Sequence, residues 1–395
     1  MRTLFKNPLY KKLAVVQFLI YFGSFFSTVA IYTLVVELDA TPIQIAITSV
    51  AFLVPSLFGF LSGAIVDKYL SKKFMAITLF LEALFSSFIL FIYSIEQFWF
   101  LIFLIILRAT CSFIFFASQM ALFPQLTTNT TELKNLNTLH SMIWSINFAL
   151  GMSLGGVVVN FMGVRGAIII DVALFLLAFL IFLTIDFNKT TNKEKTIINL
   201  IKEGLIYLKN SPLTLKLMLL HASIALTNFD TIINLLAKYE YASFIAVPLT
   251  IGFLNATRAL ALLIGASFLN KYINKKNLEY FLFLQGIAII FWSLLQKSFF
   301  GSLLSMLFVG LLTTILWSYT YTLMQLSVKK EYLGRVVAYS DMLFMLFSIS
   351  VSFLSGYLYE KGVSLQLITA ILGVGFFIFA FYYKGLKKKL NLHRY

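Results

Sequence analysis

The sequence predicts an all-α membrane protein in which twelve transmembrane helices form two pseudo-symmetric six-helix bundles. Three observations support this fold class. Hydrophobic residues make up 60% of the 395-residue chain and charged residues only 12%, against roughly 25% charged residues in an ordinary soluble domain. The apolar residues gather in stretches long enough to cross a bilayer. A charged string around Asp67 also returns, nearly unchanged, in the second half of the chain.

A transmembrane helix needs about 20 apolar residues to cross roughly 30 Å of hydrocarbon. Six such stretches precede a polar segment and six follow it, so we expect an N-terminal bundle at 1–185, a cytoplasmic linker at 186–212 and a C-terminal bundle at 213–395. The expected spans are 13–36, 43–66, 74–95, 98–123, 139–162, 166–185, 213–236, 244–268, 278–296, 299–325, 336–358 and 365–383.

The repeated string relates the two halves. GAIVDKYLSKK at 63–73 lies between the second and third spans of its half, and GASFLNKYINKK at 265–276 occupies the same place in the other half. Asp67 aligns with Asn270. The chain is therefore predicted to use one six-helix unit twice.

Lys and Arg residues set the orientation, because positively charged loops stay in the cytoplasm. With the N-terminus inside, 25 of the 31 Lys and Arg residues fall in or beside the cytoplasmic segments. Only Arg165, Lys238, Lys297 and Lys361 fall on the outer side. We therefore expect both termini to be cytoplasmic.

The polar link contains TIINLIKEGLIYLKN, in which the apolar side chains fall mainly on one helical face. Lys202, Glu203 and Lys209 lie elsewhere on the helix. Such a helix is expected to lie in the inner interface of the membrane rather than to cross it.

Several function classes are excluded by what the sequence lacks. Cys111 is alone, and His140, His221 and His393 have no metal-site spacing, so no metal site is expected. No nucleotide-binding loop or Ser/His/Asp grouping suggests an enzyme or a cofactor. The net charge of +15 is spread over loop edges such as 387–389, which suits anionic lipid rather than nucleic acid.

The loop and topology patterns together resemble the major facilitator superfamily. Its signature between the second and third helices is G-x-x-x-D-R-x-G-R-R/K, and Gly63, Asp67, Lys68 and Lys72 occupy matching positions. Leu70 stands where the second glycine is usual, and Ser71 where the arginine is.

Three further segments resemble the bacterial efflux branch of that family, which includes enterobactin-exporter-like and macrolide-efflux-like proteins. These segments are Glu203–Leu208 (EGLIYL), Asp171–Phe175 (DVALF) and Glu331–Val336 (EYLGRV). Each motif is weak alone, but their order along the chain agrees with that branch.

The resemblance implies that Asp67 acts as an inner latch. It should lie near the start of the eleventh helix, just after Gly334 and Arg335, where a carboxylate favours the positive end of the helix dipole. Asn270 would form a weaker counterpart facing the start of the fifth helix. The alternative is that both loops are only basic anchors with tight turns.

In the fifth helix, Gly151, Gly155 and Gly156 resemble the antiporter signature G-P-x-x-G-G, with Met152 replacing the proline. Glycines allow a neighbouring helix to approach closely, and we expect that neighbour to come from the other half. Plain helix packing, without any bearing on the direction of transport, is the alternative.

Charges inside the membrane are costly and usually functional. We select Arg108 and Asp230 first, with Glu82 and Arg258 next, for proton coupling or cavity charge; Arg108 lies where the family carries a functional arginine. Asp230 is the expected proton carrier, and Arg258, on the next helix at a depth differing by roughly 5 to 10 Å, is expected to form a state-dependent pair with it. Asp171 and Asp341 lie nearer helix ends, where snorkelling or capping is a sufficient account. The alternative for the first four is ion pairing that fixes helix order.

Aromatic residues make up 17% of the chain, and Trp144, Trp317 and Tyr319 are candidates to line the cavity. An apolar, aromatic cavity suits amphipathic or lipophilic cargo. The expectation is a monomeric, proton-coupled exporter of a drug-like molecule or siderophore in the bacterial inner membrane. Alternatives are a nickel, cobalt or metabolite exporter of the same fold, and a non-transporting scaffold or sensor.

Overall fold

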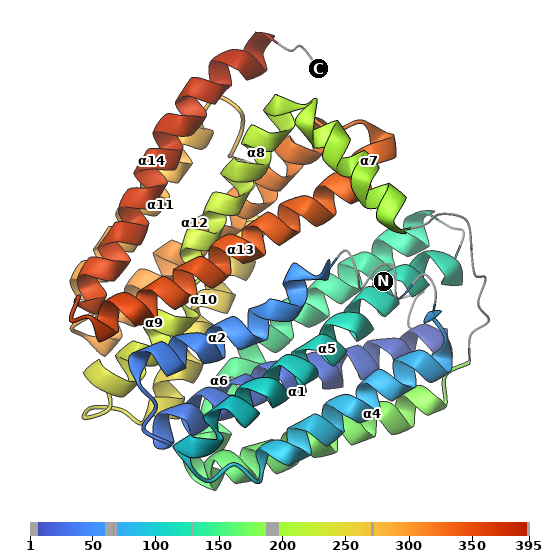
Figure 1. The fold of residues 1–395 in the computed structure, drawn as a ribbon, viewed down its shortest axis with the longest axis vertical. Helices are drawn as coiled ribbons and strands as arrows, with labels where there is room; N and C mark the ends of the chain where they lie inside the picture. The colour runs from blue at the N-terminus through green and yellow to red at the C-terminus, as the bar shows by residue number, and fades with distance from the viewer. Residues whose placement is uncertain are drawn as a thin grey trace. The chain divides into compact units, whose positions relative to one another are not determined.

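The computed structural model describes residues 7–59, 66, 69–127, 130–186, 197–269 and 272–392. All regular elements in these residues are helices (Figure 1). They are α1 (Pro8–Glu37), α2 (Pro42–Leu57), α4 (Lys72–Ile89), α5 (Phe98–Leu126), α6 (Thr130–Leu183), α7 (Ile197–Lys209), α8 (Pro212–Ala222), α9 (Asp230–Leu235), α10 (Val247–Phe268), α11 (Leu278–Leu295), α12 (Phe299–Leu326), α13 (Leu333–Glu360) and α14 (Leu365–Leu392).

The helices confirm the expected membrane fold. Within the described ranges, nine helical stretches are long and apolar enough to cross a membrane. One of them is two helices merged across a kink at Gly163, where φ is 71°, a value that favours glycine. Dividing α6 there, and adding α2 and α4, accounts for the twelve expected spans.

Contacts group the chain into two compact units. Unit 1 comprises Met1–Ala40, Ala51–Glu194 and Ile245–Ala256, and unit 2 comprises Thr41–Val50, Lys195–Phe244 and Thr257–Tyr395. Two unit boundaries therefore fall inside helices, one within α2 and one within α10. Pro55 lies inside α2 close to the first boundary, and the Asn255 side chain donates to the Ile251 carbonyl (3.0 Å) beside the second.

Unit 1 is built around α1, which packs along α6 (Figure 1). Its core contains Val16, Leu79, Phe115, Phe175 and Phe182, which are at most 2% exposed. These side chains come from α1, α4, α5 and α6, so four helices share one apolar interior. Buried polar groups in this interior are therefore shielded from water.

Unit 2 includes the close pair α11 and α14 (Figure 1). A Cβ added to Gly286 would lie 2.7 Å from the Gly373 carbonyl oxygen, and one added to Gly373 would lie 2.9 Å from the Gly286 oxygen. Only small residues permit backbones to approach so closely. Glycine is thus required at both positions.

The expected seventh span, 213–236, is interrupted. After α8 a 3₁₀ turn covers Ser223–Thr227, Asn228 is extended (φ −79°, ψ 91°), and α9 starts at Asp230. The Asn228 side chain donates to the Ser348 carbonyl and the Ser352 hydroxyl of α13, both at 3.2 Å. These bonds hold the interruption in place and set Asp230 in the first turn of a new helix.

Candidate functional site

A buried ion pair lies in unit 1. Nη2 of Arg108, on α5, is 3.3 Å from Oδ1 of Asp171, on α6, and 2.5 Å from the hydroxyl of Ser27, on α1. The two charged side chains are 4% and 1% exposed. The sequence analysis explained Asp171 by snorkelling near a helix end. That interpretation is wrong, because the Asp171 side chain is buried against the guanidinium of Arg108.

Glu82 belongs to the same cluster. It is fully buried, accepts a hydrogen bond from the Ser112 hydroxyl of α5, and interacts electrostatically with both Arg108 and Asp171. Glu82 Oε2, Asp171 Oδ2 and Arg108 Nε have no hydrogen-bond partner within the described part of the chain. Two carboxyl groups thus share one guanidinium in an interior that contains few other partners.

A second ion pair lies in unit 2, at the interrupted helix. Nη1 of Arg258, on α10, is 3.1 Å from Oδ1 of Asp230, and the guanidinium lies 5.9 Å from the centre of the Phe229 ring. The Asp230 side chain is 34% exposed and that of Arg258 is 16% exposed. Unlike the unit 1 pair, this carboxylate is accessible from outside the protein interior.

Aromatic side chains cluster beside His221 of α8. Its ring lies 4.7 Å from that of Trp317 and 5.0 Å from that of Tyr321, both on α12, and 6.0 Å from that of Phe344 on α13. Nδ1 of His221 is hydrogen-bonded to the Thr320 hydroxyl at 2.9 Å. His221 is fully buried, so it packs and positions these rings.

The other two predicted cavity residues, Tyr319 and Trp144, belong to different units. Tyr319 is half-buried on α12. Trp144 is on α6 in unit 1, where its ring contacts those of Phe25 and Phe148 at 5.6 and 5.5 Å. Trp144 is 39% exposed, so the aromatic candidates are divided between the two units.

The glycine motif packs closely on two different helices. Cβ atoms added to Gly151 and Gly155 would lie 2.7 Å from Cβ of Phe25 and from the carbonyl oxygen of Phe26, both on α1. One added to Gly156 would lie 2.5 Å from the Pro248 carbonyl oxygen of α10. Only Gly156 therefore faces a helix from the second half of the sequence.

The latch prediction falls largely on Gly63, Asp67, Lys68 and Asn270, which lie outside the described residues. Gly334 has open space where a Cβ would stand.

Lys72, the described member of the signature, pairs with Asp186 at 2.7 Å. The hydrogen bond from Lys72 and its positive charge hold the pKa of the exposed Asp186 carboxyl below its usual value.

Two segments that resemble the efflux branch meet in unit 2. Oε2 of Glu203, on α7, lies 2.9 Å from Nη1 of Arg335. The ring of Tyr207 stacks on that of Tyr332 (4.4 Å, 13°) and its hydroxyl accepts the Lys329 backbone N–H (3.1 Å). The link helix α7 is thereby tied to the start of α13. Neither motif indicated this contact by itself.

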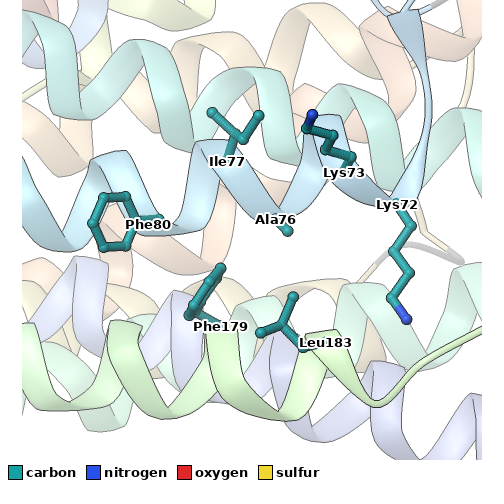
Figure 2. A pocket seen from close by; sticks show the side chains of 7 residues that line it. All are labelled: Lys72, Lys73, Ala76, Ile77, Phe80, Phe179 and Leu183. Carbon is teal, nitrogen blue, oxygen red and sulfur yellow. The ribbon is translucent and has the colours of Figure 1, made fainter.

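An apolar groove runs between α4 and α6 in unit 1, with a volume of about 670 Å³. Figure 2 shows Phe80 and Phe179 at one end and Lys72 at the other. Ile77, Phe80 and Leu183 are 44–46% exposed. The groove is therefore a feature of the outer surface of unit 1.

Across the described ranges, no group of three His, Cys, Asp or Glu side chains is placed to hold a metal ion.

The sequence pattern of the Major Facilitator Superfamily matches residues 13–349. The chain belongs to this superfamily. It is accordingly a multi-pass membrane protein of a transporter family and not an enzyme. No curated protein sequence matches the chain.

Solved structures of other superfamily transporters share the fold. A bacterial homologue of the human lysosomal transporter Spinster, inward-facing and unoccupied, has a TM-score of 0.77 at 13% identity, covering 98% of this chain and 99% of that one. The nucleoside transporter NupG has a TM-score of 0.71 at 18% identity, covering 96% and 99%. The POT family transporter PepTSo has a TM-score of 0.74 at 10% identity, covering 98% and 99%.

Proposed function

We propose that the protein is a proton-coupled secondary transporter that exports a small amphipathic or lipophilic compound by alternating access. The observation that carries the proposal is the pair of Asp230 and Arg258 at the interrupted helix. An accessible carboxylate beside a cation can leave that partner and carry a proton when the pair opens, a common role of carboxyl groups inside membranes. A discontinuous helix is a recurrent location for such sites.

The aromatic side chains support an amphipathic or lipophilic cargo. Trp317, Tyr321 and Phe344 offer half-buried rings, and such rings bind apolar bodies better than they bind sugars or phosphates. A siderophore and a drug-like molecule both fit this class.

The proposed setting is the bacterial inner membrane, with a monomer whose termini are both cytoplasmic. The 25 to 4 distribution of Lys and Arg supports this orientation. We also retain the bundles 1–185 and 213–395 as the transporting halves, the link 186–212 as cytoplasmic, and Asp67 as the inner latch.

Transport by the purified protein tests the function. Proteoliposomes containing the full chain, given an imposed pH gradient, should accumulate a lipophilic dye or a siderophore several-fold above protein-free vesicles. A protonophore should abolish the accumulation, because the gradient supplies the driving force. Accumulation that the protonophore leaves intact would contradict proton coupling. Uptake of nickel or cobalt alone would favour the metal alternative, and no flux of any cargo would favour a scaffold or sensor.

A further inference from the structure

We propose that Asp341, together with the rings of Trp317, Tyr321 and Phe344, forms a binding site in unit 2 for a cationic cargo. This inference rests on the proposed function and deepens it, because it assigns a positive charge to the transported compound. The site combines a carboxylate with aromatic faces, the two chemical groups that recognise an organic cation in apolar surroundings.

The helices place these four side chains together. Trp317 and Tyr321 lie one turn apart on α12, and their rings are parallel (6.5 Å, 9°). Phe344, on α13, meets Trp317 edge to face (4.6 Å, 89°). Asp341 lies one turn before Phe344 on the same side of α13. Since consecutive spans run in opposite directions, Asp341 comes opposite Tyr321, with which it interacts electrostatically.

The carboxylate of Asp341 lacks a partner in the described ranges, and this indicates a ligand. The other charged side chains in the middle of the described spans form the two ion pairs and the Glu82 hydrogen bond reported above. Asp341 is half-buried, about 12 Å along α13 from Leu333. It has neither a hydrogen bond nor an ion pair to any residue of the described ranges. Carboxylates at such positions are normally paired, and a cationic cargo would supply the missing partner.

The surroundings also suit a cation with an apolar body. Trp317, Tyr321, Phe344 and Asp341 are all half-buried, so each side chain is partly accessible. His221 packs behind the rings with its Nδ1 engaged by Thr320, which keeps them in place. An anionic cargo would be repelled by Asp341 and would find no positive group in this cluster.

Two ions of the same shape and opposite charge test the site. Tetraphenylphosphonium should bind the detergent-solubilised full chain at least about 10-fold more tightly than tetraphenylborate, since only the cation can pair with Asp341. Asp341→Asn should lower affinity for tetraphenylphosphonium about 10-fold and leave tetraphenylborate unchanged. Trp317→Leu should weaken both. Glu96→Gln, which removes an exposed carboxylate in unit 1, is the matched control and should change neither.

Equal binding of the two ions, no binding of tetraphenylphosphonium, or full affinity in Asp341→Asn would each overturn the site. Binding in detergent requires no proton gradient. Charge-selective binding without proton-driven transport would therefore contradict only the proposed coupling to protons. Proton-driven transport together with unchanged binding in Asp341→Asn would contradict only the proposed cation site.

A separate observation concerns the groove between α4 and α6. We infer that it holds an acyl chain of an anionic phospholipid whose headgroup lies at Lys72 and Lys73. Ala76, Phe80 and Phe179 give it an apolar lining (Figure 2). Its length from Lys72 to Phe80 is about 12 Å, close to the roughly 15 Å depth of one leaflet of hydrocarbon.

Charge selects an anionic headgroup. Lys12 donates to the Thr184 carbonyl (3.0 Å) at the same end of the groove, so three lysines gather there around a single described carboxylate, Asp186. The proposed orientation puts this end at the cytoplasmic face, where anionic lipids attract basic clusters.

Lipid binding can be measured by native mass spectrometry of the full chain. Phosphatidylglycerol should bind more tightly than phosphatidylcholine with the same acyl chains, and Lys72→Ala/Lys73→Ala should lower its affinity about 10-fold. Lys275→Ala/Lys276→Ala, the aligned lysines of the second half, is the matched control and should have little effect. Equal affinity for the two lipids, or an equal loss in both double variants, would overturn the groove as a lipid site.

Discussion

Asp230→Asn is expected to reduce proton-driven accumulation of cargo to the level of protein-free vesicles. Asparagine keeps the size of the side chain and its hydrogen bond to Arg258, but it cannot take up or release a proton. Exchange of labelled for unlabelled cargo across the same vesicles should continue, since it needs no net proton movement. Both rates are measured in proteoliposomes with and without a pH gradient.

Asp230→Glu is the matched variant, because it keeps a titratable carboxyl group near Arg258. It should retain part of the gradient-driven accumulation. If Asp230→Asn still concentrates cargo, Asp230 is structural and Glu82 becomes the leading proton carrier. A loss of exchange as well as accumulation would point to damage to cargo binding or to folding.

Arg108→Leu is expected to destabilise the protein by about 3–5 kcal/mol, the usual cost of removing one partner of a buried ion pair. Asp171 would be left charged in an apolar interior alongside Glu82. The loss of stability is measured by unfolding the purified protein in detergent with heat or denaturant.

Two variants separate this effect from a general loss of arginine. Arg108→Leu/Asp171→Leu removes both charges and should recover most of the lost stability, since apolar pairs often replace buried ion pairs without cost. Arg165→Leu removes an exposed arginine that stacks on Tyr93 at 4.0 Å and should cost less than about 1 kcal/mol. A stable Arg108→Leu protein would show that the ion pair contributes little.

The sequence predicted the transmembrane helices well because each depends on a local property, a run of about 20 apolar residues. The break at Gly163 also falls where two runs were separated. The interruption at Asn228 was not foreseen, since no proline or glycine marks it. It depends on hydrogen bonds to Ser348 and Ser352, more than 100 residues away.

The same difference between local and distant determinants applies to the site. Arg108, Glu82, Asp230 and Arg258 could be selected from the sequence because a charged residue inside an apolar run is easy to recognise there. The burial of Asp171 against Arg108 could not be predicted, because its position near the end of an apolar run does not show which way its side chain faces. Whether a charged side chain faces a partner depends on the rotation of each helix about its own axis. That rotation is set by contacts with distant segments, so neighbouring residues in the sequence do not reveal it.

In α2 and in α10 the chain passes from one unit to the other within a continuous helix. At Val50–Ala51 and at Ala256–Thr257 the boundary between the two units falls inside a helix. Pro55 has no N–H to offer the Ala51 carbonyl, so α2 can bend there without breaking a ladder hydrogen bond. In α10 the Asn255 side chain gives the Ile251 carbonyl a second donor, which can retain that carbonyl when the backbone bond lengthens. Bending stiffness is thus lowered beside the two unit boundaries that fall inside helices.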